Sequence, residues 1–193
     1  MRSACVFCGS RSGTEPAYDE AARELGRTLA AENITLVYGG GRVGLMGVVA
    51  EAALGAGGEV VGVIPQALLE REIAHTGLTD LRVVGSMHER KALMSELSEG
   101  FIALPGGTGT LEEFFEVLTW AQLGEHRKPC ALLNAGRYFD PLLALFDHMV
   151  AKGFLSEVHR AMVVVETEPE ALLEALAGYT PPSVVKWIDR AET

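Results

Sequence analysis

Cysteine, basic residues and long apolar runs are all scarce in this sequence, and each shortage excludes a class of protein. The three cysteines are an odd number and form no repeated pattern, which argues against a disulfide framework. Lys and Arg number 16 against 26 Asp and Glu, giving a formal net charge of −10. Because nucleic-acid binding depends on neutralising phosphates with cations, we expect no nucleic-acid partner. No apolar run approaches the ~20 residues of a membrane helix, so we expect no membrane partner either.

The N-terminus lacks the features of a secretion signal. Residues 1–9 contain one basic residue and a short strand-like run, without the longer apolar segment and cleavage site of a signal peptide. Together with the cysteine usage, this predicts a cytoplasmic protein. Cys5 and Cys8 have the spacing of a metal or redox pair, but no second pair completes a zinc site. We interpret both as core residues and predict no metal site.

Short apolar runs alternate with helix-like stretches along the chain, and 48% of the residues are hydrophobic. Continuously apolar strands between helices are typical of a parallel sheet that is covered on both faces. The pattern predicts a single doubly wound, Rossmann-like α/β domain over residues 1–180, with a mostly parallel sheet and helices on both faces, and a C-terminal tail at 181–193. Strands are expected at 4–7, 35–38, 59–64, 80–84, 101–104, 130–133 and 161–165. Helices are expected at 16–32, 87–98 and 141–152, and a last one begins near 169. Two more follow glycine-rich segments: one runs from the segment at 39–47 to about 56, and the other from the segment at 105–110 to 123.

Three glycine-containing segments follow expected strands, at Gly9-Ser10, 39–47 and 105–110. Ligands of such folds bind at the carboxyl ends of the strands, so these segments should lie at one edge of the sheet. The segment at 105–110 stands between a buried strand and a helix, the arrangement that captures phosphate on free backbone N–H groups. Its residues are Pro105, Gly106, Gly107, Thr108, Gly109 and Thr110. Ser10 could add a hydroxyl to the same phosphate.

The glycines Gly39, Gly41 and Gly44 match the dinucleotide fingerprint in spacing. That fingerprint also needs an acid at the end of the next strand, and none stands there, so a dinucleotide is disfavoured. We expect Gly41 and Gly44 to allow close approach of a mononucleotide or its phosphate; tight helix–sheet packing is the alternative. Neither glycine segment has the Lys-Ser/Thr pair of a nucleoside-triphosphate loop.

Glu113 has two possible roles. With Thr110 as N-cap it completes a capping box, which would make it a helix-capping residue. The preceding glycines favour a functional role, because a cap alone does not need them. A carboxylate facing a phosphate would repel it, so we expect Glu113 to face the sugar, where it can stabilise positive charge or activate water.

Arg90 lies on the apolar stripe of its helix, three residues after Met87 and four before Met94. An isolated arginine in that position usually extends to the helix edge. With an anion-binding turn and an acid expected nearby, we favour a polar cleft, where Arg90 would pair with a ligand phosphate or with Glu113.

With these motifs identified, the sequence resembles the LOG family of cytokinin riboside 5′-monophosphate phosphoribohydrolases. The signature Pro-Gly-Gly-x-Gly-Thr-x-x-Glu is complete at 105–113, Met-x-x-Arg-Lys stands at 87–91, and residues 119–124 also match. The resemblance implies hydrolysis of the N-glycosidic bond of an N6-substituted adenosine 5′-monophosphate, without a cofactor, by a homodimer. It implies that Arg90 and Glu113 are catalytic. The nucleotide-binding residues it implies are Glu72, Met87, Lys91, Gly106, Gly107, Thr108, Gly109, Thr110, Glu112 and Thr119.

Two other functions are compatible with the same fold. A carrier protein could bind a nucleotide or cofactor without hydrolysing it, although it would need neither Arg90 nor Glu113. The family has also been labelled lysine decarboxylase, a chemistry that usually employs pyridoxal phosphate on a lysine. Lys91 is the lysine nearest a motif, and it follows an arginine on a helix, so we disfavour that reading.

Overall fold

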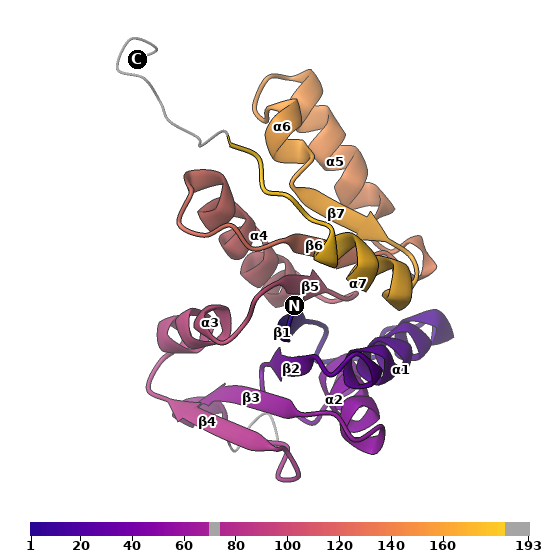
Figure 1. Ribbon diagram of the computed structural model, residues 1–193, viewed down its shortest axis with the longest axis vertical. Helices are drawn as coiled ribbons and strands as arrows, with labels where there is room; N and C mark the ends of the chain where they lie inside the picture. The colour runs from indigo at the N-terminus through magenta and orange to yellow at the C-terminus, as the bar shows by residue number, and fades with distance from the viewer. Residues whose placement is uncertain (70–73, 184–193) are drawn as a thin grey trace.

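The computed structural model describes residues 1–69 and 74–183, which form one seven-stranded sheet with helices on both sides (Figure 1). Neighbouring strands of this sheet are parallel throughout, and their order is β4-β3-β2-β1-β5-β6-β7. This confirms the predicted doubly wound α/β fold. The strands are β1 (Ser3–Phe7), β2 (Thr35–Tyr38), β3 (Val60–Pro65), β4 (Asp80–Val84), β5 (Phe101–Ala103), β6 (Cys130–Leu133) and β7 (Val163–Glu166).

Helices connect the strands at nearly every step. The α-helices are α1 (Pro16–Ala31), α2 (Gly44–Gly55), α3 (Met87–Glu96), α4 (Thr108–Leu123), α5 (Asp140–Ala151), α6 (Glu157–Arg160) and α7 (Pro169–Ala177). Short 3-10 helices span Gln66–Leu68 and Ala135–Arg137. Among the described residues, no helix has both the length and the apolar composition needed to cross a bilayer.

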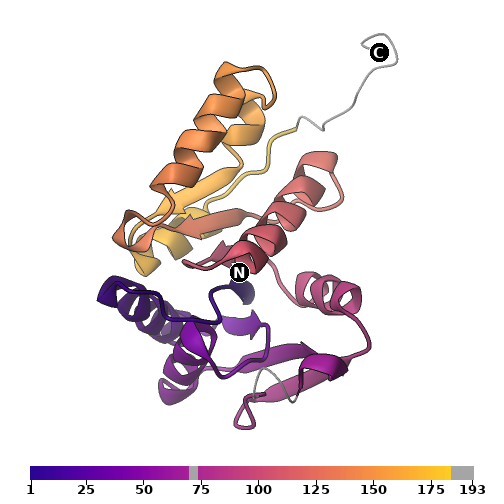
Figure 2. The same ribbon diagram turned by 180° about the vertical axis from the view of Figure 1, so that it is seen from behind.

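Alternate residues of each strand face opposite helical layers. In β1, Ala4 and Val6 pack with α1, α2 and α7, whereas Cys5 and Phe7 pack with α4 and α5. Both views of the ribbon show α1 and α2 together on one side of the sheet and α3 and α4 on the other (Figures 1 and 2). Because both faces of these central strands are buried, their sequences are continuous apolar runs rather than alternating ones.

The end of the chain differs from the prediction in one region. The short helix α6 was not predicted, and β7 begins at Val163 instead of residue 161. Ser156 caps α6 by accepting a hydrogen bond from the backbone N–H of His159. The N–H groups of Ala161 and Met162 then bond back to α6, so these two residues complete a turn and cannot pair in the sheet.

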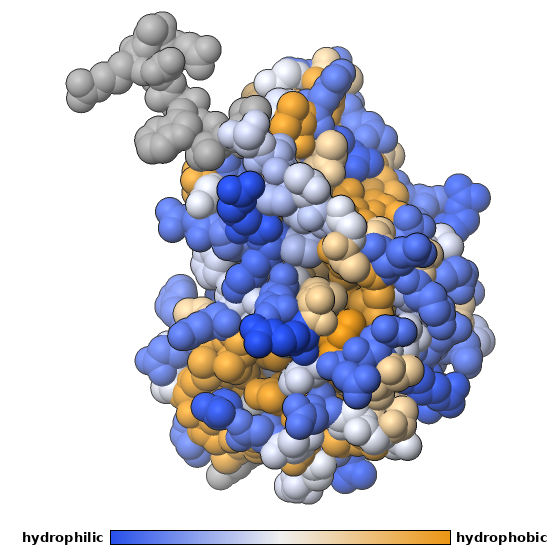
Figure 3. Space-filling view, viewed as in Figure 1, coloured by the Kyte–Doolittle hydropathy of each residue, from blue (hydrophilic) through white to orange (hydrophobic). Residues whose placement is uncertain are grey.

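Several large apolar side chains remain exposed on the described surface. Phe154 is 85% exposed, and Val83, Leu123 and Leu145 are between 45% and 47% exposed. On the face shown in Figure 3, apolar side chains gather over β3 and β4. Exposed apolar surface of this kind is typical of an interaction face.

Candidate functional site

The order in which the chain adds strands to the sheet reverses between β1 and β5, two neighbouring strands near the centre of the sheet. The chain progresses outward from β1 to β4 on one side, then returns to β5 on the other side of β1. The loops after β1 and β5 diverge at this point, and a backbone hydrogen bond from Gly9 N to Pro105 O (3.0 Å) joins them. A crevice at such a reversal is where doubly wound sheets bind ligands.

The helix α2 begins directly against the loop after β1. Gly44, the first residue of α2, has φ of +57°, and a Cβ atom there would overlap the backbone of Ser10 and Arg11. Glycine is therefore required by conformation and by contact. Gly41 is buried and forms an isolated antiparallel bridge with Ala74. Gly44 thus has a packing role of the kind that the sequence left open as an alternative, and a ligand contact of either glycine stays a prediction.

The helix α4 starts earlier than the capping-box prediction places it. Its N-cap is Gly107 and its first residue is Thr108, so Thr110 lies in the first turn and is buried. The prediction of Thr110 as N-cap and Glu113 as its capping partner is therefore wrong. Glycine at the N-cap let the helix extend back to Thr108, and the first backbone bond of the helix runs from Leu111 N to Gly107 O (3.2 Å).

This helix start presents three N–H groups to the crevice. The amides of Thr108, Gly109 and Thr110 precede the first intrahelical donor, so helix geometry leaves them pointing out of the N-terminus. Together with the helix dipole they make this end of α4 attractive to an anion. Glu113 lies in the second turn, past the capping positions.

Arg90 enters the site from α3, which begins at a capped turn. The hydroxyl of Ser86 accepts a hydrogen bond from Glu89 N (3.1 Å), and the carboxylate of Glu89 accepts one from Gly85 N (2.8 Å). This cap fixes the register of α3. As a result, Arg90 points inward over the carboxyl ends of β2 and β3, where it is only 6% exposed.

The guanidinium group of Arg90 fits a slot in the backbone. Its Nε donates to Val63 O (3.1 Å), its Nη2 donates to Gly39 O (2.9 Å), and its Nη1 lies 3.8 Å from the Sδ of Met87. A Cβ atom on Gly39 would overlap Nη2, so the slot exists because residue 39 is glycine. Backbone carbonyls thus hold a cation in place without neutralising it.

Arg90 and Glu113 line one cavity of about 350 Å³, although they come from helices on opposite sides of β5 in the sequence. The N-terminus of α4 forms part of the same wall. The lining residues are Cys8, Ser10, Met46, Leu68, Met87, Arg90, Gly107, Thr108, Gly109, Thr110, Glu112 and Glu113. Burial raises the pKa of the Cys8 thiol well above its usual range, so this thiol stays protonated and is a poor nucleophile.

A second cavity, of about 460 Å³, meets the first at Ser10 and Gly107. Tyr18 and Tyr138 form one of its walls, with ring centroids 5.5 Å apart in an edge-to-face contact. The hydroxyl of Tyr138 donates to Gly106 O (2.5 Å) and so ties the glycine loop to the connection after β6. Gly106 lines this second cavity rather than the first.

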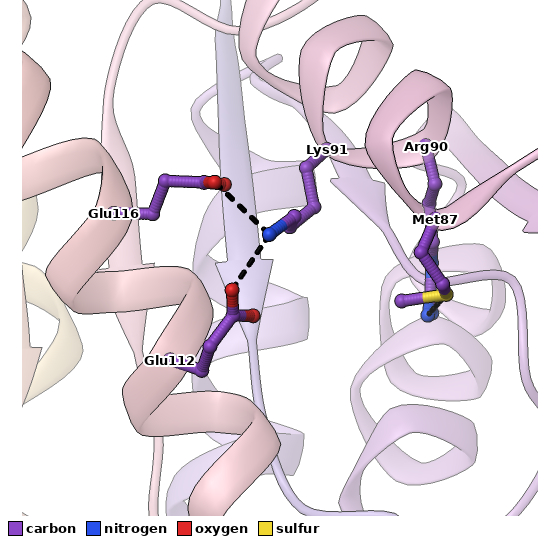
Figure 4. Close-up of polar contacts among 5 residues, drawn as sticks. All are labelled: Met87, Arg90, Lys91, Glu112 and Glu116. Atoms are coloured by element: carbon purple, nitrogen blue, oxygen red, sulfur yellow. Dashed lines mark hydrogen bonds and ion pairs between the residues drawn. The ribbon is translucent and has the colours of Figure 1, made fainter.

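Two further residues predicted for the site, Lys91 and Thr119, line neither cavity. Lys91 points to α4, where its Nζ lies 2.6 Å from an oxygen of Glu112 and 3.0 Å from one of Glu116 (Figure 4). These carboxylates, Glu112 foremost, raise the pKa of Lys91. Thr119 is exposed on α4 and lines neither cavity. Glu72 lies outside the described residues.

Several residues of the site were not predicted. Met46 and Leu68 give the first cavity an apolar wall, and Tyr138 anchors the glycine loop. Gly39 had a signal in its glycine-rich segment, but its role depends on a helix 51 residues away. Among the described residues, no three His, Cys, Asp or Glu side chains lie where they could hold a metal ion.

Comparisons with known proteins identify relatives of this chain. Residues 46–176 match the protein family described as "Possible lysine decarboxylase". A cytokinin riboside 5′-monophosphate phosphoribohydrolase from Rhodococcoides fascians is 52% identical over 91% of this chain and 89% of its own length. One from Arabidopsis thaliana is 50% identical over 92% of this chain and 82% of its own.

Solved structures share the fold at lower identity. The molybdenum cofactor carrier protein of Chlamydomonas reinhardtii superposes with a TM-score of 0.70 at 22% identity, covering 92% of this chain and 98% of that one. The molybdenum cofactor binding protein of Rippkaea orientalis gives 0.67 at 23% identity, covering 92% and 96%. At these identities the likeness shows the fold alone. The identity to the curated relatives goes further: this chain belongs to the LOG family of cytokinin riboside 5′-monophosphate phosphoribohydrolases.

Proposed function

We propose that this protein hydrolyses the N-glycosidic bond of N6-substituted adenosine 5′-monophosphates, releasing the free base and ribose 5-phosphate. The observation that carries the proposal is the shared cavity of Arg90, Glu113 and the N-terminus of α4. The N-terminus of α4 suits the phosphate of a ribose 5-phosphate group, and the carboxylate of Glu113 suits the sugar carbon at its other end. The names of the relatives at about half identity support the same reaction.

The phosphate binds at the start of α4. The amides of Thr108, Gly109 and Thr110 supply donors, and the hydroxyl of Ser10 faces the same cavity from the β1 loop. Backbone donors suit a protein of net charge −10, because they attract an anion locally without a cluster of cations. The contacts with the phosphate hold the sugar in position for reaction, so binding energy far from the cleaved bond lowers the activation barrier.

Glu113 acts on the sugar. Cleavage of the C1′–N9 bond sends its electron pair to the base and leaves positive charge on C1′ and the ring oxygen. The carboxylate stabilises that charge and accepts a proton from the water that attacks C1′, while the departing base takes up a proton from solvent at a ring nitrogen and Glu113 then returns its own proton to solvent. Arg90 keeps Glu113 ionised and oriented, since a cation nearby favours the charged form of a carboxyl group.

The base lies against the apolar part of the cavity. Met46, Leu68 and Met87 are the large apolar side chains that line it. Methionine side chains adapt to irregular shapes and pack well on aromatic rings, so they suit a purine with variable N6 substituents. The nucleoside monophosphate is thus the small-molecule partner that we assign.

Lysine decarboxylation fits the site poorly. A Schiff base with pyridoxal phosphate needs a lysine that loses its proton readily. Lys91 has the opposite environment: two carboxylates contact its ammonium group and raise its pKa. We therefore assign no cofactor to this protein.

We also propose a cytoplasmic homodimer. All three cysteines are free thiols and are buried, in keeping with a reducing compartment. The exposed apolar side chains described above would be covered in a dimer.

The test is base release by purified protein and by its Glu113→Gln variant. Wild-type protein incubated with AMP and with N6-substituted AMP should release free base, measured by liquid chromatography, while the unphosphorylated nucleosides should react far more slowly. The variant should bind AMP in calorimetry but lose at least about a hundredfold in kcat, the usual contribution of acid–base catalysis. Binding of AMP without base release by the wild type would instead indicate a carrier.

A further inference from the structure

Lys91 connects two helices that otherwise pack on different strands. The helix α3 packs mainly against β3 and β4, whereas α4 packs mainly against β5, β1 and β6. The ammonium group of Lys91 lies 2.6 Å from Glu112 and 3.0 Å from Glu116, both on α4. The side chains of Lys91 and Glu116 are only 12% and 25% exposed, so their contact is partly sheltered from water, whereas Glu112 is 56% exposed and its contact is open to screening by salt.

Lys91 extends in a different direction from its neighbour Arg90. Figure 4 shows Lys91 directed toward α4, while Arg90 and Met87 extend in another direction from the same helix. Arg90 and Met87 line the cavity, and Lys91 does not. The contacts of Lys91 are therefore with the protein and not with the space that the substrate would occupy.

The position of Lys91 matters because the proposed catalytic pair is divided between the same two helices. Arg90 adjoins Lys91 on α3, and Glu113 adjoins Glu112 on α4. The backbone of β2 and β3 holds the guanidinium group of Arg90 in its slot. The contacts of Lys91 with Glu112 and Glu116 join the two helices.

Lys91 also changes the charge around Glu113. Glu113 is three residues before Glu116, a spacing that brings side chains together on one helix face, and it adjoins Glu112 in the sequence. The charge of Glu113 also acts on the Cys5 and Cys8 thiols of the β1 segment, and burial keeps both thiols neutral. Without the ammonium group of Lys91, the negative charges of Glu112 and Glu116 would act on Glu113 with less positive charge to offset them.

We propose that Lys91 is a positioning residue for base release: it joins α3 to α4 at the separation that places Arg90 opposite Glu113, and it offsets the carboxylate charge beside Glu113. This inference rests on the proposed function and assigns Lys91 a role different from the nucleotide contact that the family resemblance implies.

The first test is the kinetics of Lys91→Met. The variant should lose about tenfold or more in kcat while KM for AMP changes little, because the lost group acts on the transition state and not on binding. The acidic limb of its pH–rate profile should move to higher pH. Lys152→Met is the matched control: Lys152 is exposed after α5, and its loss should leave both constants unchanged.

The second test is rescue. In Lys91→Met/Glu116→Gln one uncompensated carboxylate is removed, so part of the lost kcat and of the pH shift should return. Lys91→Arg, which keeps the charge, should also remain more active than Lys91→Met. A Lys91→Met variant with raised KM, unchanged kcat and no response to Glu116→Gln would show a substrate contact and overturn the proposal.

The third test does not depend on turnover. Carbon-13 NMR of labelled glutamate carboxyl groups, with the Glu113 signal assigned by Glu113→Gln, follows the titration of Glu113 directly. Its midpoint should rise in Lys91→Met and fall back when Glu116→Gln is added; an unchanged midpoint would contradict the inference. If the wild type releases no base, the proposed function fails, while this titration still decides the role of Lys91.

Discussion

At the scale of the residue, the site depends on the fit between Gly39 and Arg90. The guanidinium group occupies space that any Cβ atom at residue 39 would fill, and it donates to the carbonyl groups of Gly39 and Val63. A buried cation placed by two backbone carbonyls has little freedom to move. Its geometry is therefore set before any substrate arrives, which lowers the cost of organising the site.

We expect Gly39→Ala to displace the Arg90 guanidinium and lower kcat for base release by about tenfold or more. The matched control is Gly55→Ala, because a Cβ atom at residue 55 meets no atom within 4 Å. That control should keep full activity and equal or higher thermal stability, since alanine favours helices over glycine. Equal activity of both variants would show that the slot is unimportant.

The residue scale also shows what a sequence can and cannot reveal. The sequence predicted that Arg90, Glu113 and the loop at 105–110 belong to one site, and residues of all three line one cavity, because motif and helix periodicity are local properties. The slot at Gly39 could not, because its cause is a helix 51 residues further along. The resemblance placed Lys91 at the nucleotide, whereas its contacts are with Glu112 and Glu116.

At the scale of the element, helix ends were harder to predict than helix positions. The strands at 35–38, 80–84 and 130–133 have their predicted bounds, because apolar runs bounded by turns are strong signals. The predicted start of α4 was wrong by three residues, because a capping box and a glycine N-cap compete within one segment. That shift places Glu113 in the second turn, away from capping.

The connection from α4 to β6 should make stability depend on pH. His126 bonds through Nε2 to Val117 O (2.9 Å), while its Nδ1 accepts a hydrogen bond from Lys128 N (3.1 Å). This pair of contacts requires the neutral ring with its proton on Nε2. Burial lowers the pKa of His126, so below about pH 6.5 the unfolded chain binds the proton more readily than the folded one.

We therefore expect the free energy of unfolding to fall as the pH drops from about 6.5 toward 5.5, measured by urea denaturation. His126→Asn, whose side-chain oxygen can accept from Lys128 N without titrating, should reduce that slope. A slope equal to that of the wild type would assign the pH dependence to other groups.

At the scale of the whole molecule, the exposed apolar surface indicates an interaction face. Phe154 and several other large side chains contact water in the single chain, and apolar groups gather over β3 and β4 (Figure 3). Burial of such groups stabilises association by roughly 25 cal/mol per Å². The proposed homodimer would cover part of this surface.

Light scattering should give a mass about twice the 20.6 kDa of one chain. Because apolar burial and not ion pairing would hold the dimer, the mass should stay the same when NaCl rises from about 0.1 to about 1 M. A mass of one chain at micromolar concentration, or dissociation by salt, would contradict this expectation.

The reversal of strand order at the centre of the sheet has a consequence for how the enzyme could be divided. Residues 1–97 supply Ser10, Gly39 and Arg90, and residues 98–183 supply Glu113 and the start of α4. Each fragment would carry half of a reaction centre and be inert by itself. Two separately produced fragments should therefore regain turnover only when β1 of one pairs with β5 of the other. Activity would then report directly on fragment complementation.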